Sequence, residues 1–452
     1  MGLGQFGGGL GAVQYLLSQG ADVTVTDLRP AEALQDSLAR IDGSQLRRLI
    51  LGEHQEQDFL DADLIVVNPA VHQAENPFLK LARERGIGLT SEMNLFWERC
   101  RGRKILVTGS VGKSTTATLI HQFLQAGNRT CRLGGNLGVS LLPEVDRIHE
   151  EDFVVLELSS FQLADLDRLH PAPEIAVVTN FYPNHLDWHG NLDHYRDAKQ
   201  TAIAWQNANQ MAVLNGDDPD SSLWPTDARV IWFGREIWRD RPGIHFTADE
   251  ITVRSPIGGW KIHEIDLAPS LRHEHGFSNV AAALAVAVIG LEIPVPCLAD
   301  VLKNYVPLPH RLEQVAEVQG RIFINDSKAT TPESTLAALK SVSGPIILIV
   351  GGKDKGSDLS RMAAAIAQRA KIVLCLGDTA SELIKKISAE QSNTLQNVIP
   401  SRNLNEAVQA AWQMSQPGDV LLFSPGCASH AEFANYERRG ERFVECVKQI
   451  DA

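Results

Sequence analysis

The segment that most constrains the fold is Val107–Thr115, which reads Val-Thr-Gly-Ser-Val-Gly-Lys-Ser-Thr. It begins at the end of an apolar run, Lys104–Thr108, that predicts a buried strand, and a helical pattern follows over Thr116–Gln125. A strand that turns through glycines into a helix gathers backbone N–H groups and a helix N-terminus around one point, which attracts phosphate. In such a loop Lys113 can reach the β- and γ-phosphates, and Ser114 can place its hydroxyl on Mg²⁺. The segment therefore predicts a nucleotide site at the edge of a parallel sheet.

The same segment departs from the general phosphate-loop pattern, because Val107 stands where that pattern has its first glycine. The loop has the shorter form G-x-x-G-K-[ST], and a glycine–lysine turn after a strand also arises by chance. A plain structural turn is therefore the alternative to a nucleotide site. If the loop binds ATP, its contacts are expected from Gly109, Ser110, Val111, Gly112, Lys113, Ser114 and Thr115.

Strand-like and helix-like segments alternate along the chain. In the first hundred residues, Val23–Asp27 and Leu64–Asn68 are typical of buried parallel strands, and Ala12–Gln19 has a helical pattern. The stretch Trp232–Leu267 is richer in turns and predicts antiparallel strands, whereas Ser278–Gly290 predicts an alanine-rich helix. Further buried strands are expected at Phe153–Leu158, Ile175–Asn180, Arg321–Asn325, Pro345–Val350, Ile372–Leu376 and Val420–Phe423.

This alternation predicts an α/β fold. A chain of 452 residues is too long for one ordinary hydrophobic core, so several domains are expected. The proline-rich stretch Val306–Pro309 is the clearest boundary signal. We expect three domains, each a mainly parallel sheet with flanking helices. They are a Rossmann-like domain over residues 1–98, a central ATPase domain of the phosphate-loop type over 99–307, and a Rossmann-like domain over 308–452.

Charge and hydropathy exclude several classes of protein. The formal net charge of −13 argues against a chain that wraps nucleic acid. The longest apolar run, Ala281–Leu291, is well short of the ~20 residues that span a bilayer. No secretory signal is visible near residue 1, and the six cysteines are scattered without a C-x-x-C pair. We expect a cytoplasmic enzyme without membrane insertion.

The first residues carry a second glycine pattern. Gly2–Gly7 reads G-x-G-x-x-G, and Asp27 follows it by twenty residues at the end of a predicted strand. This spacing is the dinucleotide-binding fingerprint, so an NAD-dependent oxidoreductase is one alternative. The strand that should precede the glycines is nearly absent, since the pattern starts at the second residue given. The fingerprint alone is therefore a weak signal.

Two polar residues follow buried strands of the central segment. Glu157 ends the strand before Ser-Ser-Phe-Gln, and His185 follows the strand that ends near Asn180. The carboxyl ends of parallel strands share one edge of a sheet, where α/β proteins bind ligands. Both residues are candidate Mg²⁺ ligands, although Mg²⁺ prefers oxygen and a lone histidine is more often structural.

Together these motifs resemble the Mur ligase family and the related folylpolyglutamate synthases. The resemblance runs from Gly2 to Gly440 and includes T-G-x-x-G-K-S-T, then E-L-S-S-F-Q at residues 157–162 and N-x-x-x-N-H-L-D-x-H at 180–189. It implies an ATP-dependent ligase that forms an amide bond through an acyl phosphate. The D-S-K-A-T turn at residues 326–330 indicates the member that adds D-glutamate to UDP-N-acetylmuramoyl-L-alanine in peptidoglycan precursor synthesis. Another Mur-type ligase or a folylpolyglutamate synthase is the nearest alternative, and a non-catalytic nucleotide-sensing module is a further one.

The resemblance also implies roles for particular residues. Two Mg²⁺ ions would be held by Ser114, Glu157, His185 and a carbamylated Lys199, and Lys113, Lys199 and His185 would be catalytic. ATP would also meet Asn279, Arg311 and Asp326. The UDP substrate would meet Gln5, Phe6, Asp27, Arg29, Ala70 and Asn136, and D-glutamate would meet Lys328, Thr330, Lys355, Ser429 and Tyr436. A monomer is expected. Val111, Asn184 and Gly276 depart from the family's residues at the ATP and metal sites.

Overall fold

The computed structural model describes residues 1–4, 7–73, 75–138, 140–183, 185–235, 243–247, 249–255, 258–272, 274–306, 308–342, 344–353, 358–429 and 433–450. The chain separates into two compact units. The first contains Met1–His263 and Ser278–Val301, and the second contains Glu264–Phe277 and Leu302–Ala452. Within the described residues, no helix is both long and apolar enough to cross a bilayer.

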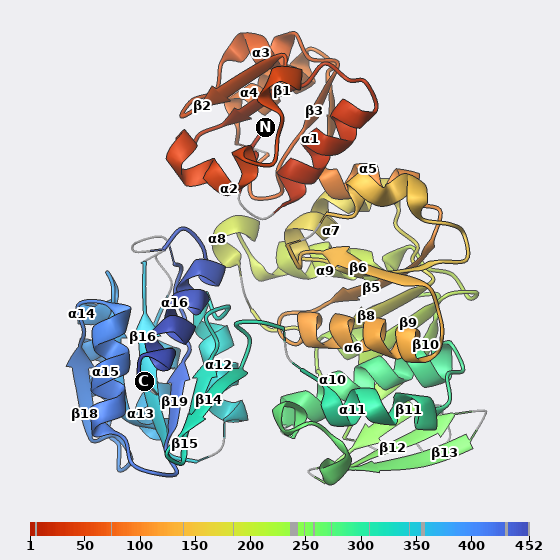
Figure 1. Ribbon diagram of the computed structural model, residues 1–452. Coiled ribbons are helices and arrows are strands. Elements are labelled where there is room, and N and C mark those ends of the chain that lie inside the picture. The colour runs from red at the N-terminus through yellow and green to blue at the C-terminus, as the bar shows by residue number, and fades with distance from the viewer. Residues whose placement is uncertain are drawn as a thin grey trace. The chain divides into compact units, whose positions relative to one another are not determined.

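A nine-stranded sheet forms the centre of the first unit (Figure 1). Its order is β13-β12-β11-β10-β9-β8-β5-β7-β6, and neighbours from β6 to β11 pair in parallel. The strands β7 and β8 are buried at every residue, which explains their continuous apolar sequence. The strands are β5 (Arg103–Thr108), β6 (Cys131–Gly135), β7 (Phe153–Glu157), β8 (Ile175–Val178), β9 (Met211–Asn215), β10 (Arg229–Gly234), β11 (Gly243–Phe246), β12 (Glu250–Ser255) and β13 (Gly258–His263).

The antiparallel strands predicted late in this segment are β12 and β13, which form a hairpin at the sheet edge. The strand β11 joins the two halves, because it pairs in parallel with β10 and antiparallel with β12. The predicted alanine-rich helix is α10 (Glu274–Leu284), which continues as a π-helix over Ala285–Gly290. The other helices of this region are α5 (Glu92–Arg99), α6 (Lys113–Ala126), α7 (Ser160–Leu166), α8 (Leu186–His189) and α9 (Leu192–Ala204).

The position of β5 locates the candidate site. β5 lies between β7 and β8, and β6 continues the sheet on the β7 side while β9 continues it on the β8 side. The register pairs Val107 with Glu157 and Thr108 with Val178, so the three strands end together. In open α/β sheets the point where the strand order reverses leaves a crevice for ligands. The phosphate loop leaves β5 at that point.

The N-terminal segment of the first unit differs from the single sheet expected there. It has two separate parallel pairs, β1 with β2 and β3 with β4. The first residues lie between them: Gly2 N donates to Thr26 O at 2.8 Å, and Asn68 N donates to Met1 O at 3.0 Å. These bonds form no regular ladder, so the sheet is divided. The elements are α1 (Gly8–Ser18), β1 (Thr24–Asp27), α2 (Gln35–Leu38), β2 (Arg48–Leu51), α3 (Glu56–Leu60), β3 (Leu64–Val66), α4 (Pro77–Glu84) and β4 (Gly88–Thr90).

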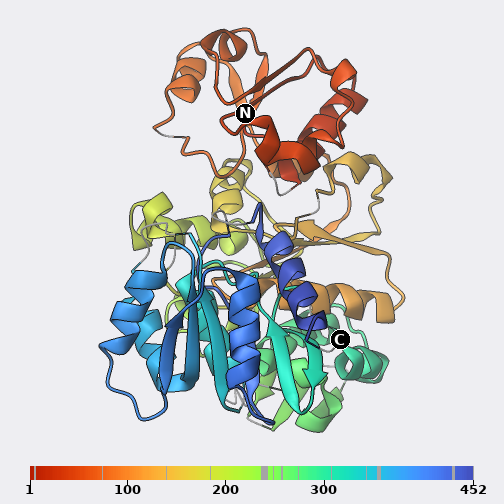
Figure 2. The same cartoon turned by 60° about the vertical axis from the view of Figure 1, so that its left-hand side comes forward.

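The second unit is built on a six-stranded sheet of order β14-β15-β19-β16-β17-β18, parallel except for β14 against β15. Helices cover both of its faces (Figures 1 and 2). One apolar cluster lies under α12, α13 and α14, and another under α15 and α16. The elements are β14 (Glu313–Val318), β15 (Arg321–Asn325), α12 (Pro332–Ser341), β16 (Ile346–Gly351), α13 (Ser360–Arg369), β17 (Ala370–Leu376), α14 (Ala380–Ser388), β18 (Asn397–Pro400), α15 (Leu404–Met414), β19 (Val420–Phe423) and α16 (Tyr436–Lys448). The short α11 (Ala299–Asn304) precedes them.

Candidate active site

The phosphate loop is shaped by two glycines in the left-handed region. Gly109 has a φ of 141° and Gly112, the N-cap of α6, has a φ of 89°. A Cβ on Gly109 would lie 1.9 Å from Thr179 Oγ1, and one on Gly112 would lie 2.3 Å from Asn279 Oδ1. Both positions therefore exclude any side chain, for conformational and steric reasons. The helix start after Gly112 gives the arrangement of N–H groups that favours phosphate.

Asn180, which sequence reasoning did not single out, fixes this loop from the end of β8. Val111 N donates to Asn180 Oδ1 at 2.9 Å, and Asn180 Nδ2 donates back to Val111 O at 2.9 Å. Ser110 N donates to the main-chain oxygen of Asn180 at 3.0 Å, and Thr179 Oγ1 donates to Val111 O at 2.6 Å. These bonds use main-chain atoms of Val111, so they do not depend on its side chain. The available signal was the pair of polar residues directly after a buried strand.

Asn279, expected to contact ATP, lies against the base of the same loop. It is 9% exposed, and Thr116 Oγ1 lies 3.4 Å from its Oδ1. Because a Cβ on Gly112 would meet the same oxygen, the carboxamide packs directly on the glycine. Gly276, a departure from the family's residues, is buried in the first turn of α10, and a Cβ there would fall 2.2 Å from Leu271 O. Glycine at that position therefore has a packing reason.

Two lysines converge on one carbonyl of the loop. Lys113 Nζ donates to Gly109 O at 2.9 Å and to Ser110 O at 3.0 Å, while Lys199 Nζ donates to Gly109 O at 2.8 Å. Lys199 belongs to α9 and is 2% exposed, although a lysine in a helix is usually a solvent-exposed residue. Burial, and next the charge of Lys113, hold the pKa of Lys199 well below its usual range, against the opposing effect of Glu157.

Tyr195 completes the surroundings of Lys199. Its hydroxyl lies 3.0 Å from Ser110 Oγ, and its ring centroid lies 5.0 Å from Lys199 Nζ. His185, with a φ of 54°, places its ring 4.8 Å from that of Phe161 and 6.3 Å from that of Tyr195. The structure therefore brings His185, Lys199 and the phosphate loop into one neighbourhood through Tyr195. Asn184 lies outside the described residues.

Glu157 ends β7 beside the loop and is 1% exposed. Asn136 Nδ2 donates to its Oε1 at 3.0 Å, and Asn136 N donates to its main-chain oxygen at 2.7 Å. Asn136, expected at the UDP substrate, thus also orients the expected metal ligand. No group of three His, Cys, Asp or Glu able to hold a metal occurs in the part of the chain that the structure describes. A carboxylate with the Ser114 hydroxyl nevertheless fits Mg²⁺ that arrives with a nucleotide, because phosphates and water complete its shell.

The N-terminal glycine loop is held by Asp27. Gly4 N donates to Asp27 Oδ2 at 3.0 Å, and Arg29 N donates to Asp27 Oδ1 at 2.9 Å. The carboxylate is 5% exposed and therefore braces the loop, whereas the Arg29 side chain is exposed. Ala70 N donates to Asn68 Oδ1 at 3.0 Å in the neighbouring turn. Gln5 and Phe6, also expected here, lie outside the described residues.

A buried carboxyl lies where α5 and the segment after β6 meet. Ser140 Oγ donates to Glu92 Oε1, and a Cβ on Gly11 of α1 would fall 2.2 Å from the same Ser140 Oγ. Burial raises the pKa of Glu92 to about 7, although the bond from Ser140 acts in the opposite direction. The carboxyl of Glu92 therefore ionises in the folded protein only near neutral pH.

Replacing Glu92 by glutamine is expected to stabilise the protein at alkaline pH. In the unfolded chain the carboxyl ionises above its usual 4.5, but in the fold it ionises only above about 7. The contribution of Glu92 to the free energy of unfolding is therefore fully present below pH 4.5, and it is lost as the pH rises to about 7. The difference corresponds to about 3 kcal/mol, which Glu92→Gln should recover at pH 8 because its Oε1 still accepts from Ser140. Urea denaturation at pH 5 and pH 8 measures it, with the exposed Glu98→Gln as control; an equal effect at both pH values would contradict it.

In the second unit, the turn after β15 carries three predicted residues. Asp326 is 5% exposed; Ser424 Oγ donates to its Oδ2 at 2.7 Å, and Leu312 N donates to its Oδ1 at 3.2 Å. Burial raises the pKa of Asp326 to about 7, against the bond from Ser424 and the nearby charge of Arg311. Lys328 Nζ lies 5.8 Å from the Tyr436 ring centroid. Thr330 is partly exposed two residues further on.

The turn after β19 lies beside that turn. Ser327 Oγ donates to Tyr436 O at 2.8 Å, and Lys353 N, after β16, donates to Ala428 O at 2.9 Å, next to the buried Ser429. Three turns at the carboxyl ends of β15, β16 and β19 therefore share one edge of the sheet. Lys355 lies outside the described residues.

Three family models match successive parts of the chain. Residues 1–91 match a model described as Mur ligase MurD-like, N-terminal domain. Residues 107–287 match the Mur ligase middle domain, and residues 310–427 match the Mur ligase, glutamate ligase domain.

Relatives are similar over almost the whole length. The UDP-N-acetylmuramoylalanine–D-glutamate ligase of Roseiflexus sp. (strain RS-1) is 35% identical over 460 residues, covering 100% of this chain and 98% of that protein. The ligase of the same name from Symbiobacterium thermophilum is 35% identical over 450 residues, covering 97% and 95%. Among solved structures, UDP-N-acetylmuramate-alanine ligase MurC from Thermotoga maritima has a TM-score of 0.62 at 18% identity, covering 99% and 98%. The MurF ligase from the same organism, solved with ADP, has a TM-score of 0.58 at 19% identity, covering 95% and 96%. These two structures share the fold, and the whole-length relatives show that this chain belongs to the Mur ligase family.

Proposed function

We propose that the protein joins the carboxylate of UDP-N-acetylmuramoyl-L-alanine to the amine of D-glutamate, with ATP as co-substrate, in peptidoglycan precursor synthesis. The activity is the one that its whole-length relatives are named for. The observation in the structure that carries it is the pair of lysines, Lys113 and Lys199, on the Gly109 carbonyl of a glycine loop at the sheet's switch point. That arrangement places positive charge beside a site for a triphosphate.

The reaction needs no protein nucleophile. The substrate carboxylate attacks the γ-phosphorus of ATP, which forms an acyl phosphate and releases ADP. The amine of D-glutamate then attacks the acyl carbon; phosphate leaves and the amine gives up a proton to solvent. Lys113 would shift from the carbonyls of Gly109 and Ser110 to the β/γ-phosphate oxygens, where its charge stabilises the transferring group.

Two Mg²⁺ ions belong to the proposal, one held by Ser114 and Glu157 and the other by His185 and a carbamylated Lys199. Mg²⁺ supplies positive charge to phosphate oxygens during transfer. The carbamate forms when the neutral Lys199 amine attacks CO₂ and releases a proton. Its support is the depressed pKa of Lys199, because that amine is neutral more often than an exposed one.

The remaining contacts are proposed for each substrate in turn. For ATP we propose the loop residues Gly109 to Thr115 with Asn279, Arg311 and Asp326. For the UDP substrate we propose Gln5, Phe6, Asp27, Arg29, Ala70 and Asn136, with Asp27 acting by holding the loop. For D-glutamate we propose Lys328, Thr330, Lys355, Ser429 and Tyr436. Support for the last set is that Lys328, Ser429 and Tyr436 lie on neighbouring turns of one sheet edge.

We further propose the domain bounds 1–98, 99–307 and 308–452, a monomeric state and a cytoplasmic location. Support for these bounds is that the three matched ranges, 1–91, 107–287 and 310–427, each fall within one of the three proposed domains. The net charge of −13 does not exclude small anionic substrates, because backbone N–H groups and single lysines can create positive pockets in an acidic protein.

Phosphate release should require both co-substrates. With ATP, Mg²⁺ and UDP-N-acetylmuramoyl-L-alanine, we expect turnover with D-glutamate and at least roughly 100-fold lower kcat/KM with L-glutamate, since the wrong enantiomer loses about two charge-assisted bonds. A coupled phosphate assay with mass spectrometry of the product measures this. A panel of other amino acids and a folate acceptor tests sister activities. Turnover with any of these in preference to D-glutamate would refute the proposal.

A further inference from the structure

The buried carboxyl of Glu92 faces the first turn of α1. Glu92 is the first residue of α5 and is 8% exposed. A Cβ on Gly8, the first residue of α1, would lie 4.0 Å from Glu92 Oε2. A Cβ on Gly11 would lie 2.2 Å from Ser140 Oγ, which donates to Glu92 Oε1. Glycine at position 11 therefore leaves room for Ser140, and the carboxyl that Ser140 holds lies beside the start of the helix.

The start of α1 is also where an anion is expected to bind. The proposed function places the UDP substrate at Gln5 and Phe6, directly before the N-cap residue Gly7. A G-x-G-x-x-G turn holds a diphosphate at the N-terminus of its helix, because unpaired N–H groups and the helix dipole both attract negative charge. The first turn of α1 has no acidic residue of its own. Glu92 therefore brings a carboxyl from another helix to the end of α1 that faces the diphosphate.

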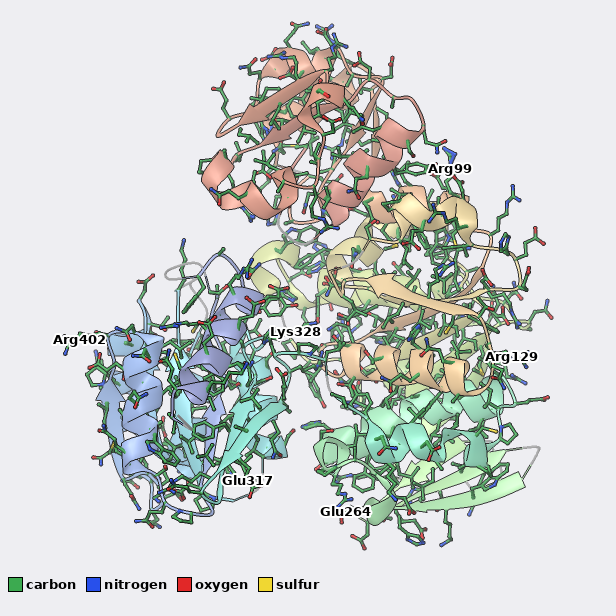
Figure 3. All side chains as sticks on the ribbon, in the orientation of Figure 1. Arg99, Arg129, Glu264, Glu317, Lys328 and Arg402 are labelled. Atoms are coloured by element: carbon green, nitrogen blue, oxygen red, sulfur yellow. The ribbon has the colours of Figure 1, made fainter. Side chains whose placement is uncertain are left out.

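No cation of the described residues is bonded to the Glu92 carboxyl. Burial raises its pKa to about 7, and the bond from Ser140 acts in the opposite direction. α5 packs against α1, α7 and the 3-10 turn Leu142–Arg147, and Lys104 of β5 lies over the ring of Trp97. The titratable residues of these elements and of α5 with its C-cap are Tyr15, Asp165, Glu144, Asp146, Arg147, Glu98, Cys100 and Arg99, the last of which is labelled in Figure 3. None of these described groups contributes to the raised pKa of Glu92.

Two anions at one helix start oppose each other. A bound diphosphate favours the neutral form of a carboxyl nearby, so that binding and protonation assist one another. An ionised carboxyl in a buried place weakens the binding of the diphosphate, because little water separates the two charges. We infer that Glu92 couples the binding of the UDP substrate to the uptake of a proton: the neutral carboxyl permits a diphosphate at the start of α1, and the ionised carboxyl opposes it. The inference rests on the proposed function, which supplies the ligand.

Calorimetric titration of the full chain with UDP-N-acetylmuramoyl-L-alanine tests the coupling. The diphosphate and the carboxylate of this ligand keep their charges between pH 6 and pH 8. The affinity of the wild type should fall by up to about tenfold between these pH values, the ratio of the neutral fractions of a carboxyl with a pKa of about 7. At pH 7, binding should take up about half a proton, measured from the binding enthalpies in two buffers of different ionisation enthalpy.

Two variants assign the proton to this carboxyl. Glu92→Gln keeps an acceptor for Ser140 without the charge, so its affinity should be equal at pH 6 and pH 8 and its binding should take up no proton. Ser140→Ala removes a bond that lowers the pKa of Glu92, so the fall in affinity should move to higher pH. Glu98→Gln, an exposed change on the same helix, is the control and should match the wild type.

A wild-type affinity that is equal at pH 6 and pH 8 would overturn the inference, and so would the same fall in Glu92→Gln as in the wild type. If Glu92→Gln does not fold, an unshifted pH profile in Ser140→Ala would overturn it. A chain that shows the expected pH dependence but does not use D-glutamate would refute the proposed function and leave the proton coupling in place. A chain that binds no UDP substrate at either pH would refute both.

Discussion

Replacing Lys199 by alanine is expected to lower kcat by roughly 100-fold or more, because the variant loses both an amine beside the phosphate loop and the proposed carbamate. Lys199 Nζ bonds to Gly109 O at 2.8 Å from a buried position on α9, and the other lysine on this oxygen, Lys113, belongs to the phosphate loop itself. Bicarbonate together with a short carboxylic acid should restore part of the activity, since the acid can occupy the space of the carbamate. Initial rates of ADP formation, with and without these additives, measure both effects.

Two comparisons separate chemistry from folding. Lys199→Met keeps most of the buried volume and should be as inactive as the alanine variant, but with a wild-type melting temperature. Wild-type protein in carbon-dioxide-depleted buffer should lose activity and recover it when bicarbonate is added. Full activity of Lys199→Ala would contradict any catalytic role for this lysine. If Lys199→Ala loses activity that the additives do not restore, and the wild type is insensitive to CO₂, the proposed carbamate would be contradicted. A role for the unmodified Lys199 amine would remain.

The second large effect is expected for Lys113→Met, which should lower kcat roughly 100- to 1000-fold, the loss typical of removing one stabilising group from a transition state. Lys113 Nζ lies on the carbonyls of Gly109 and Ser110, at the mouth of the loop. The loop keeps its glycines, so KM for ATP should rise much less than kcat falls. Steady-state kinetics with varied ATP separates the two parameters.

Lys80→Met, an exposed substitution on α4, is the matched control and should behave as the wild type. Lys113→Arg tests geometry, because it retains charge on a longer and planar group; we expect it to stay strongly impaired. If Lys113→Met releases phosphate at the wild-type rate, the loop is a structural turn and ATP binds elsewhere.

The fold was predictable because its signals are local. Buried parallel strands are continuous apolar runs, and the seven individual strands predicted between Lys104 and Phe423 lie within a few residues of their expected bounds, whereas β6, β9, β14 and β18 were not predicted. The divided N-terminal sheet was not predictable, since it depends on whether the first residues form a regular ladder between β1 and β3. Pattern reasoning cannot decide that, because the same residues satisfy their backbone bonds either way.

The site residues were predictable where a motif fixes the backbone conformation. They were less predictable where the role of a side chain depends on which hydrogen-bond partner it has in the fold. The glycines and Lys113 follow from the loop itself. Asp27 and Asp326 stand at strand ends, as ligand contacts do, yet both carboxyls bond to the fold itself. Asn180 was missed because its partner, Val111, is 69 residues distant in sequence.

The pair of hydrogen bonds between the Asn180 carboxamide and the main chain of Val111 has a consequence for nucleotide binding. A loop that is closed on itself by its own sheet is ordered when the protein folds, long before any ligand arrives. Binding then does not have to order the loop. The loss of loop conformational entropy that usually opposes association therefore does not weaken the affinity. The phosphates bind to a preformed loop. Discrimination among nucleotides therefore depends on how well each one fits the loop, and not on a ligand-driven rearrangement of this turn.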